Sequence, residues 1–214
     1  MQFAAHESKP VRGLSSSRLE SLSDGVFSIV MTLLVLDMRV PDIGPTGNAA
    51  QLHDALGRLW PYAVGYVMSF VTAGSLWIAH RGQYHFIRRT DRALLWINIA
   101  FLVFVSAIPF FTALLARYPI FRLPIVLYGA NMICSLIALF WHWRYATKGH
   151  RLASHDLSGG AIQAQSRRIL IAQGIYLTAI AIAIWWNPWV SLGLYAAVPF
   201  AFALPSELDR HWLR

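Results

Sequence analysis

The residues of this chain that could do chemistry are a few polar side chains inside otherwise apolar segments. Asp24 and Ser28 are one helical turn apart in the first of these segments. Trp77 and His80 are spaced i, i+3 on one face of a second segment, and Asn98 lies in a third. Each such group needs a partner away from lipid. We interpret them first as a polar cluster that holds three helices together, because interhelical hydrogen bonds mainly set geometry.

The sequence shows no convincing pattern for catalysis or metal binding. His80 and His85 lack the nearby acidic or cysteine partners that a metal site needs. Cys134 is the only cysteine, which excludes an internal disulfide and a thiolate metal cluster. No Ser/His/Asp, paired-carboxylate or phosphate-loop pattern occurs in an adequate context. We therefore expect no catalytic residue, no metal and no cofactor.

The composition is typical of a membrane protein. Of 214 residues, 57% are hydrophobic and 13% are charged, which is about half the charge of an average soluble domain. The formal net charge of +8 falls in short segments between apolar runs. That distribution favours contact with membrane lipids and argues against a nucleic-acid partner, which would need a basic stripe on a soluble face.

The apolar runs predict an all-α integral membrane protein with six transmembrane helices. Uncharged stretches of spanning length cover residues 59–79, 93–116, 123–141 and 169–206, and Asn187-Pro188 divides the last into two halves. Proline cannot continue a hydrogen-bonded helix, so this pair predicts a tight turn between two spans. Pro109 predicts a kink within 93–116.

The first span is shorter in its uncharged part. Only residues 25–36 lack charge, between Asp24 and Asp37. A helix over residues 19–38 would be about 30 Å long and could cross the membrane. A signal peptide is the weaker alternative, because Asp37 and Arg39 follow at once without a small-x-small cleavage site.

The basic residues predict the orientation. Fourteen of the 18 lysines and arginines fall on one side of the predicted spans. Basic residues stay cytoplasmic, so we expect a multi-pass protein of the cell membrane with both termini inside. The expected organisation is a disordered cytoplasmic tail (1–14), a six-helix domain (15–206) and a second cytoplasmic tail (207–214).

The first helix is predicted to have two different faces. At 100° per residue, one face is aliphatic or small: Leu22, Gly25, Ile29, Leu33 and Leu36, with Thr32 at its edge. Asp24, Ser28 and Met31 lie roughly opposite. The aliphatic stripe either faces lipid and neighbouring helices or meets its copies on a symmetry axis as a hydrophobic constriction. Periodicity alone favours the first interpretation.

The same segment resembles a known family. Arg18-Leu19-Glu20-Ser21-Leu22-Ser23-Asp24 is similar to the Arg-x-x-x-Phe-Ser-Asp signature of the transmembrane protein 175 family, in its prokaryotic single-repeat branch. The resemblance continues in residues 77–80, 96–98 and 108–110 and covers about residues 15–205. Leu22 departs from the signature, since the family has Phe at that position, and packing at the pore mouth is expected to differ.

The resemblance implies a potassium-permeable cation channel that assembles as a homotetramer around the first helix, with potassium as the permeant ion. By position, Ile29, Leu33 and Leu36 match the apolar constriction, and Thr32 matches a threonine linked to selectivity. A structural polar network is implied for the following residues: Arg18, Ser23, Asp24, Trp77, His80 and Asn98.

A second class of function remains open at this point. Asp24 and His80 could form the proton or substrate site of a secondary transporter or a membrane enzyme. A transporter should show inverted repeats and broken helices near the midplane, which the sequence lacks.

Overall fold

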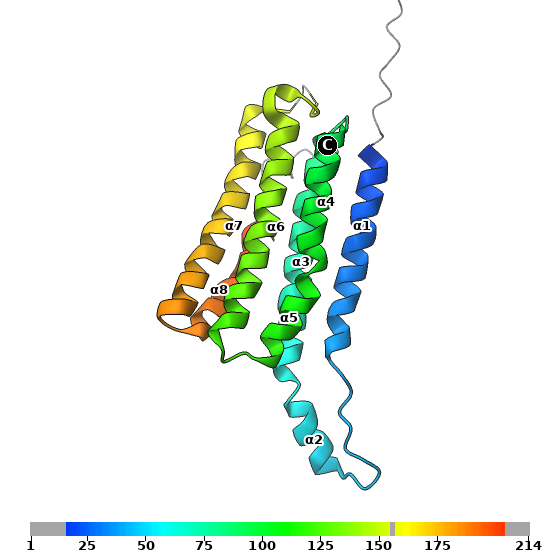
Figure 1. Ribbon diagram of the computed structural model, residues 1–214, viewed down its shortest axis with the longest axis vertical. Helices are drawn as coiled ribbons and strands as arrows, with labels where there is room; N and C mark the ends of the chain where they lie inside the picture. Colours follow the sequence, from blue (N-terminus) through cyan, green and yellow to red (C-terminus); the bar gives the residue numbers. More distant parts are fainter. Residues whose placement is uncertain (1–15, 155–156, 204–214) are drawn as a thin grey trace, which may run out of the picture.

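The computed structural model describes residues 16–154 and 157–203, so the two expected tails lie outside the described residues. Figure 1 shows long helices that run up and down side by side, with α1 and α7 at opposite edges of the bundle. The α-helices are α1 (Ser16–Leu33), α2 (Ala49–Gly57), α3 (Trp60–Phe86), α4 (Arg92–Ser106), α5 (Ile108–Arg117), α6 (Arg122–Thr147), α7 (Gly159–Trp185) and α8 (Pro188–Ala203). Short 3-10 helices, η1 (Leu34–Asp37) and η2 (Lys148–His150), follow α1 and α6.

Five stretches of the described chain are long and apolar enough to cross a membrane. They are Ser16–Asp37, Trp60–Phe86, Arg92–Arg117, Arg122–His150 and Gly159–Trp185. The sixth expected span falls on α8, an uncharged helix with 16 described residues. The all-helical membrane architecture is therefore confirmed, and the count of six spans stays a prediction.

The proline signals mark real helix boundaries. α7 ends at Trp185 and α8 begins at Pro188, and the Asn187 side chain caps the turn by accepting a 2.8 Å hydrogen bond from the Trp189 amide. The stretch expected as one span over 93–116 is divided at Ala107 into α4 and α5. Pro109 stands in the first turn of α5, where its missing N–H costs nothing.

The amphipathic helix α2 was not expected from the hydropathy pattern. It projects beyond the bundle between α1 and α3 (Figure 1) and buries none of its described residues. Asn48 and Gln51 start it with a reciprocal capping box, in which each side chain accepts a hydrogen bond from the other's amide. Such a cap satisfies two helix-end donors, so α2 forms without burial.

The core lies between α3, α4, α5, α6, α7 and α8, and α1 packs on one side of it. α6 packs against α4, α5, α7 and α8, whereas α1 contacts α3, α4 and α5. α1 buries a single face, made of Leu19, Ser23, Phe27 and Val30, and Leu34 of η1 is buried as well. Its opposite face has no neighbour within the described chain.

Candidate functional site

The aliphatic stripe expected on the first helix lies on the uncovered face of α1. Ile29 is 60% exposed and Leu36 is 65% exposed, and Leu33 is exposed as well. The buried face of the same helix points to Phe101 on α4, whose ring lies 6.0 Å from that of Phe27. A single chain therefore leaves the stripe without a protein partner.

A row of polar residues crosses α1 from the side that faces α3 to the edge of this stripe at Thr32. Glu20, Asp24, Ser28 and Thr32 follow one another at intervals of four residues, and all are at least partly exposed. The Ser28 hydroxyl donates to the Asp24 carbonyl at 2.8 Å, and the Thr32 hydroxyl lies within bonding distance of the Ser28 and Ile29 carbonyls. Ser28 thus bonds to its own helix, and the expectation that it would bond to a neighbouring helix was wrong.

Asp24 connects α1 to α3. The Trp77 indole Nε1 donates a 2.7 Å hydrogen bond to Asp24 Oδ1. The Arg81 guanidinium lies 3.7 Å from Asp24 Oδ2 and 3.7 Å from Glu20 Oε1, and 5.7 Å from the centre of the Trp77 ring. Asp24 therefore bonds to Trp77, one of the polar residues expected to meet it on neighbouring helices, whereas His80 and Asn98 bond to each other.

Arg81 and Glu20 are members of this group that sequence reasoning missed. Helical spacing offered the signal, because Arg81 is one turn after Trp77 and Glu20 is one turn before Asp24. Two carboxylates of α1 thus lie beside a guanidinium and an indole of α3 and connect the two helices. The side chains of the two ion pairs are partly exposed.

A second, buried group lies behind the first. His80 Nε2 is 2.8 Å from Asn98 Oδ1, so we assign the ring proton to Nε2. Asn98 Nδ2 donates to Ser23 Oγ at 3.2 Å, and Ser23 in turn donates to the Leu19 carbonyl at 3.0 Å. This chain links α3, α4 and α1 with each member buried.

The network continues toward α6 through residues not expected at the site. His142 Nδ1 is 2.7 Å from Gln83 Oε1, and His142 Nε2 is 3.2 Å from the Tyr84 hydroxyl. Gln83 Nε2 donates to the Leu139 carbonyl at 3.3 Å. His142 lies near the end of α6, is fully buried, and has its ring 5.5 Å from that of His80.

Arg18 stays apart from these contacts. It is exposed at the start of α1, and no hydrogen bond or ion pair joins it to the network within residues 16–154 and 157–203. The same described part of the chain holds no group of three His, Cys, Asp or Glu residues that could bind a metal ion. The site thus consists of one exposed helix face and the polar network that fixes that helix from behind.

Comparisons with known proteins match the chain at this region and beyond. A family model described as the endosomal/lysosomal potassium channel TMEM175 matches residues 18–109. A potassium channel of Streptomyces collinus is 34% identical over 173 residues, which cover 78% of this chain and 82% of the relative. A potassium channel of Chamaesiphon minutus is 31% identical over 195 residues, or 90% of this chain and 95% of the relative.

A solved structure has the same fold. It is the crystal structure of a lysosomal potassium-selective channel TMEM175 homologue from Chamaesiphon minutus, with a TM-score of 0.76 and 29% sequence identity. The superposition covers 88% of this chain and 96% of that one.

Proposed function

This chain belongs to the TMEM175 family, and we propose that it forms a potassium-permeable cation channel as a homotetramer. The family model and both bacterial relatives are named as channels and none as an enzyme, which agrees with the absence of a catalytic pattern. Potassium is the proposed permeant ion, and no cofactor is needed to pass it.

The observation that carries the proposal is the uncovered face of α1. A helix that faced lipid all along this side would hold Glu20 and Asp24 close to hydrocarbon, where each charge costs roughly 3 kcal/mol or more. The polar row that leads from Glu20 to Thr32 at the edge of the stripe stays partly exposed, which supports a face turned toward water or neighbouring subunits. A symmetry axis next to α1 meets that requirement, because copies of α1 would then enclose a path.

In that assembly, Ile29, Leu33 and Leu36 would form the narrow apolar layers of the pore. Rings of this kind repel water and hold a closed state by dewetting, and an ion passes only by losing part of its hydration shell. Potassium gives up water more easily than sodium does, so such a ring favours potassium. Thr32, at the edge of the stripe, would offer hydroxyl oxygens to the partly dehydrated ion.

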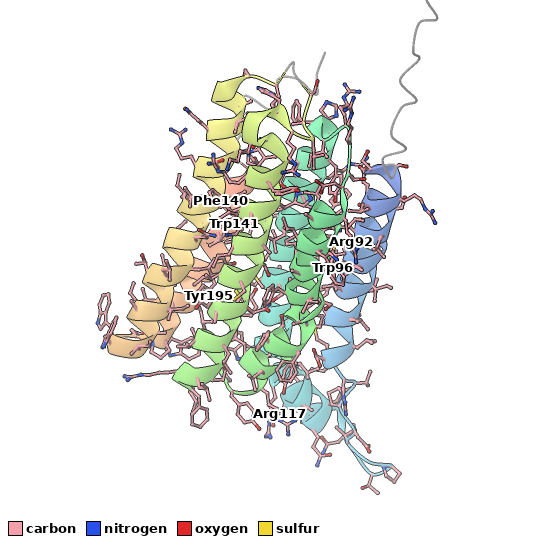
Figure 2. All side chains as sticks on the ribbon, turned by 45° about the horizontal axis from the view of Figure 1, so that its top comes forward. Arg92, Trp96, Arg117, Phe140, Trp141 and Tyr195 are labelled. Carbon is pink, nitrogen blue, oxygen red and sulfur yellow. The ribbon has the colours of Figure 1, made fainter. Side chains whose placement is uncertain are left out.

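The polar network would hold α1 in place against the other helices. Ser23 and Asp24 contact α4 and α3 directly, through Asn98 and Trp77, with His80 as the next member. Arg18 is free of these contacts in a single chain, and we propose that it contributes between subunits. The end of the bundle that carries Arg92 would face the cytoplasm, opposite the end that carries Arg117 (Figure 2), with both termini inside and residues 15–206 as the channel domain.

Potassium flux through purified protein in liposomes tests this function against the transporter alternative. A channel passes potassium down its gradient with no dependence on a proton or sodium gradient. Protein-free liposomes treated with valinomycin give the maximal potassium flux for comparison. Uncoupled flux supports the channel. Flux that requires a second ion gradient would favour a transporter that uses Asp24 and His80.

A further inference from the structure

Two loops at the Arg92 end of the bundle are joined into one unit by backbone hydrogen bonds. The amides of Arg88 and Arg89 donate to the Leu152 carbonyl at 2.9 and 3.3 Å. The Ser154 amide donates to the Phe86 carbonyl at 2.9 Å, and Ile87 pairs with Ala153 as an antiparallel bridge. Ile87, Leu152 and Ala153 are buried, so apolar anchors hold the loop after α3 against the loop after α6.

This unit encloses a basic pocket of about 310 Å³. It is lined by Arg88, Arg89, His150 and Arg151 together with residues 152–154. The three arginines are charged at any physiological pH, and none of the described lining residues is acidic. The pocket is thus a concave surface that concentrates positive charge.

Asp91 offsets only part of this charge. Its Oδ2 lies 3.6 Å from Arg151 and accepts a 2.7 Å hydrogen bond from the Tyr145 hydroxyl, while Oδ1 accepts one of 2.9 Å from the Leu94 amide. Burial raises the pKa of Asp91, but the hydrogen bonds from Leu94 and Tyr145 and the charge of Arg151 outweigh it and lower the pKa below its usual value. Asp91 therefore stays ionised and orients Arg151, which leaves Arg88 and Arg89 available to an anion.

Exposed tryptophans place the pocket at the level of lipid headgroups. Trp96 and Trp141 are each 61% exposed on α4 and α6, and Figure 2 shows both toward the Arg92 end of the bundle. Tryptophan marks the membrane–water interface. Trp141 precedes the end of α6 at Thr147 by six residues, or about 9 Å along the axis. The headgroup layer is roughly 5–8 Å thick, so the loops after α3 and α6 emerge at its outer edge, and the pocket lies within an arginine side chain's length of the lipid phosphates.

We propose that this pocket binds the phosphate of an anionic membrane lipid. Arginine forks match phosphate oxygens with paired, charge-assisted hydrogen bonds, and the pocket volume reaches the range of small-ligand sites. The same chemistry would accept free phosphate, but the level of the tryptophans favours a lipid as the source. The site lies at the loops and is separate from the proposed ion path along α1. Lipid binding and channel function can therefore be tested independently.

Whether the bound phosphate belongs to a lipid is tested with the purified full-length protein in detergent. Dihexanoyl phosphatidylglycerol is titrated against it and binding is measured by native mass spectrometry, with dihexanoyl phosphatidylcholine and sodium phosphate in parallel. We expect phosphatidylglycerol to bind at least tenfold more tightly than either. Phosphate that binds as tightly as the lipid would overturn the lipid as source, and equal binding of the two lipids would overturn the site.

Matched arginine variants test the location. The double variant Arg88→Gln/Arg89→Gln should weaken phosphatidylglycerol binding at least tenfold. Arg117→Gln/Arg122→Gln removes the same charge at the opposite end and should change it less than twofold. If the first variant does not elute as the wild type does on size exclusion, Arg151→Gln replaces it, because its side chain is 60% exposed. Equal loss in both end variants would mean that net charge alone, and not this pocket, attracts the lipid.

Discussion

The Trp77 indole donates a 2.7 Å hydrogen bond to Oδ1 of Asp24, and this contact fixes α1 against α3. Asp24→Ala removes the acceptor and leaves the Trp77 N–H and the Arg81 charge without it. Loss of one partner of a buried polar pair costs on the order of 1–3 kcal/mol, and this pair is only partly buried, so we expect a cost at the lower end of that range. We expect a lower thermal midpoint and less assembled protein, measured by fluorescence-detected size exclusion.

Asp24→Asn is the matched control for that change. It keeps a carbonyl oxygen for the Trp77 indole and removes only the charge, so its loss of stability should be smaller. If Asp24→Ala assembles at wild-type levels and alters ion selectivity alone, Asp24 lines the ion path and its assignment to the supporting network is wrong.

Gly129 on α6 marks a close contact with α7 and α8. A Cβ at this position would meet the Tyr195 hydroxyl and lie 2.8 Å from Ile180 Cγ1. Tyr195 is held there by its hydrogen bond to the Ile125 carbonyl, at 3.0 Å. Gly129→Ala should therefore destabilise the protein by about 1–3 kcal/mol, which is the usual cost of overpacking, and thermal unfolding in detergent measures it.

Gly174 on α7 provides the comparison for Gly129. A Cβ built there has no heavy atom of the described residues within 4 Å. Gly174→Ala should leave the midpoint unchanged or raise it, because alanine favours a helix by about 1 kcal/mol over glycine. Similar midpoints for the two variants would show that α6 does not pack as closely on Tyr195 as the structure has it.

The proposed orientation follows from the uneven distribution of basic residues. A green fluorescent reporter fused after Arg214 should fluoresce, because it folds in the cytoplasm, and a phosphatase reporter there should be inactive. The same pair of reporters fused after Gly57, at the end of α2, should give the reverse. An active phosphatase after Arg214 contradicts a cytoplasmic C-terminus.

The sequence predicted most helices, because hydropathy and proline are local signals. Asn187-Pro188 separated α7 from α8, and Pro109 marked the break between α4 and α5. The helix α2 was missed because it is short and amphipathic, although Asn48 and Gln51 have the spacing of a capping box. Hydropathy reports burial in lipid, and α2 lies outside the bundle.

The pairing of polar residues was less predictable than their membership of the network. Helix periodicity placed Ser23 and Asp24 on one helix and His80 and Asn98 on others, but it carries no information on rotation between helices. Ser23, rather than Asp24, lies at the Asn98 amide, since the two neighbours point 100° apart. The contact of His142 with Gln83, 59 residues away in the chain, follows from the packing of α6 on α3 and could not be predicted from the sequence.

Substitution at Ile29 probes the constriction. If four copies of Ile29 form a dry ring, Ile29→Asn places amides there that replace part of the hydration shell of an ion. Current should rise, by about tenfold for each 1.4 kcal/mol removed from the barrier, and the preference for potassium over sodium should fall. Planar-bilayer recording under biionic potassium and sodium measures both.

Two neighbouring positions serve as comparisons for Ile29. Thr32→Ala should lower selectivity with a smaller effect on conductance, since it removes a hydroxyl from the edge of the stripe. Met31 is half-buried, and its Cε lies 3.8 Å from the position of a Cβ on Gly74 of α3, so Met31→Asn should damage assembly instead. Altered conductance from Met31→Asn with none from Ile29→Asn would place the path on the other side of α1.

Silver-ion modification of single cysteines tests most directly whether the uncovered face of α1 lines the ion path. In a Cys134→Ser background, Ile29→Cys is compared with Leu177→Cys on α7, since the native side chains are 60% and 57% exposed and α7 lies at the opposite edge of the bundle. Silver is a small monovalent cation that a potassium pore admits and that binds thiolates irreversibly. We predict that micromolar silver blocks the current of Ile29→Cys and leaves that of Leu177→Cys unchanged. Block of Leu177→Cys with no effect on Ile29→Cys would contradict the account, because α1 would then face lipid.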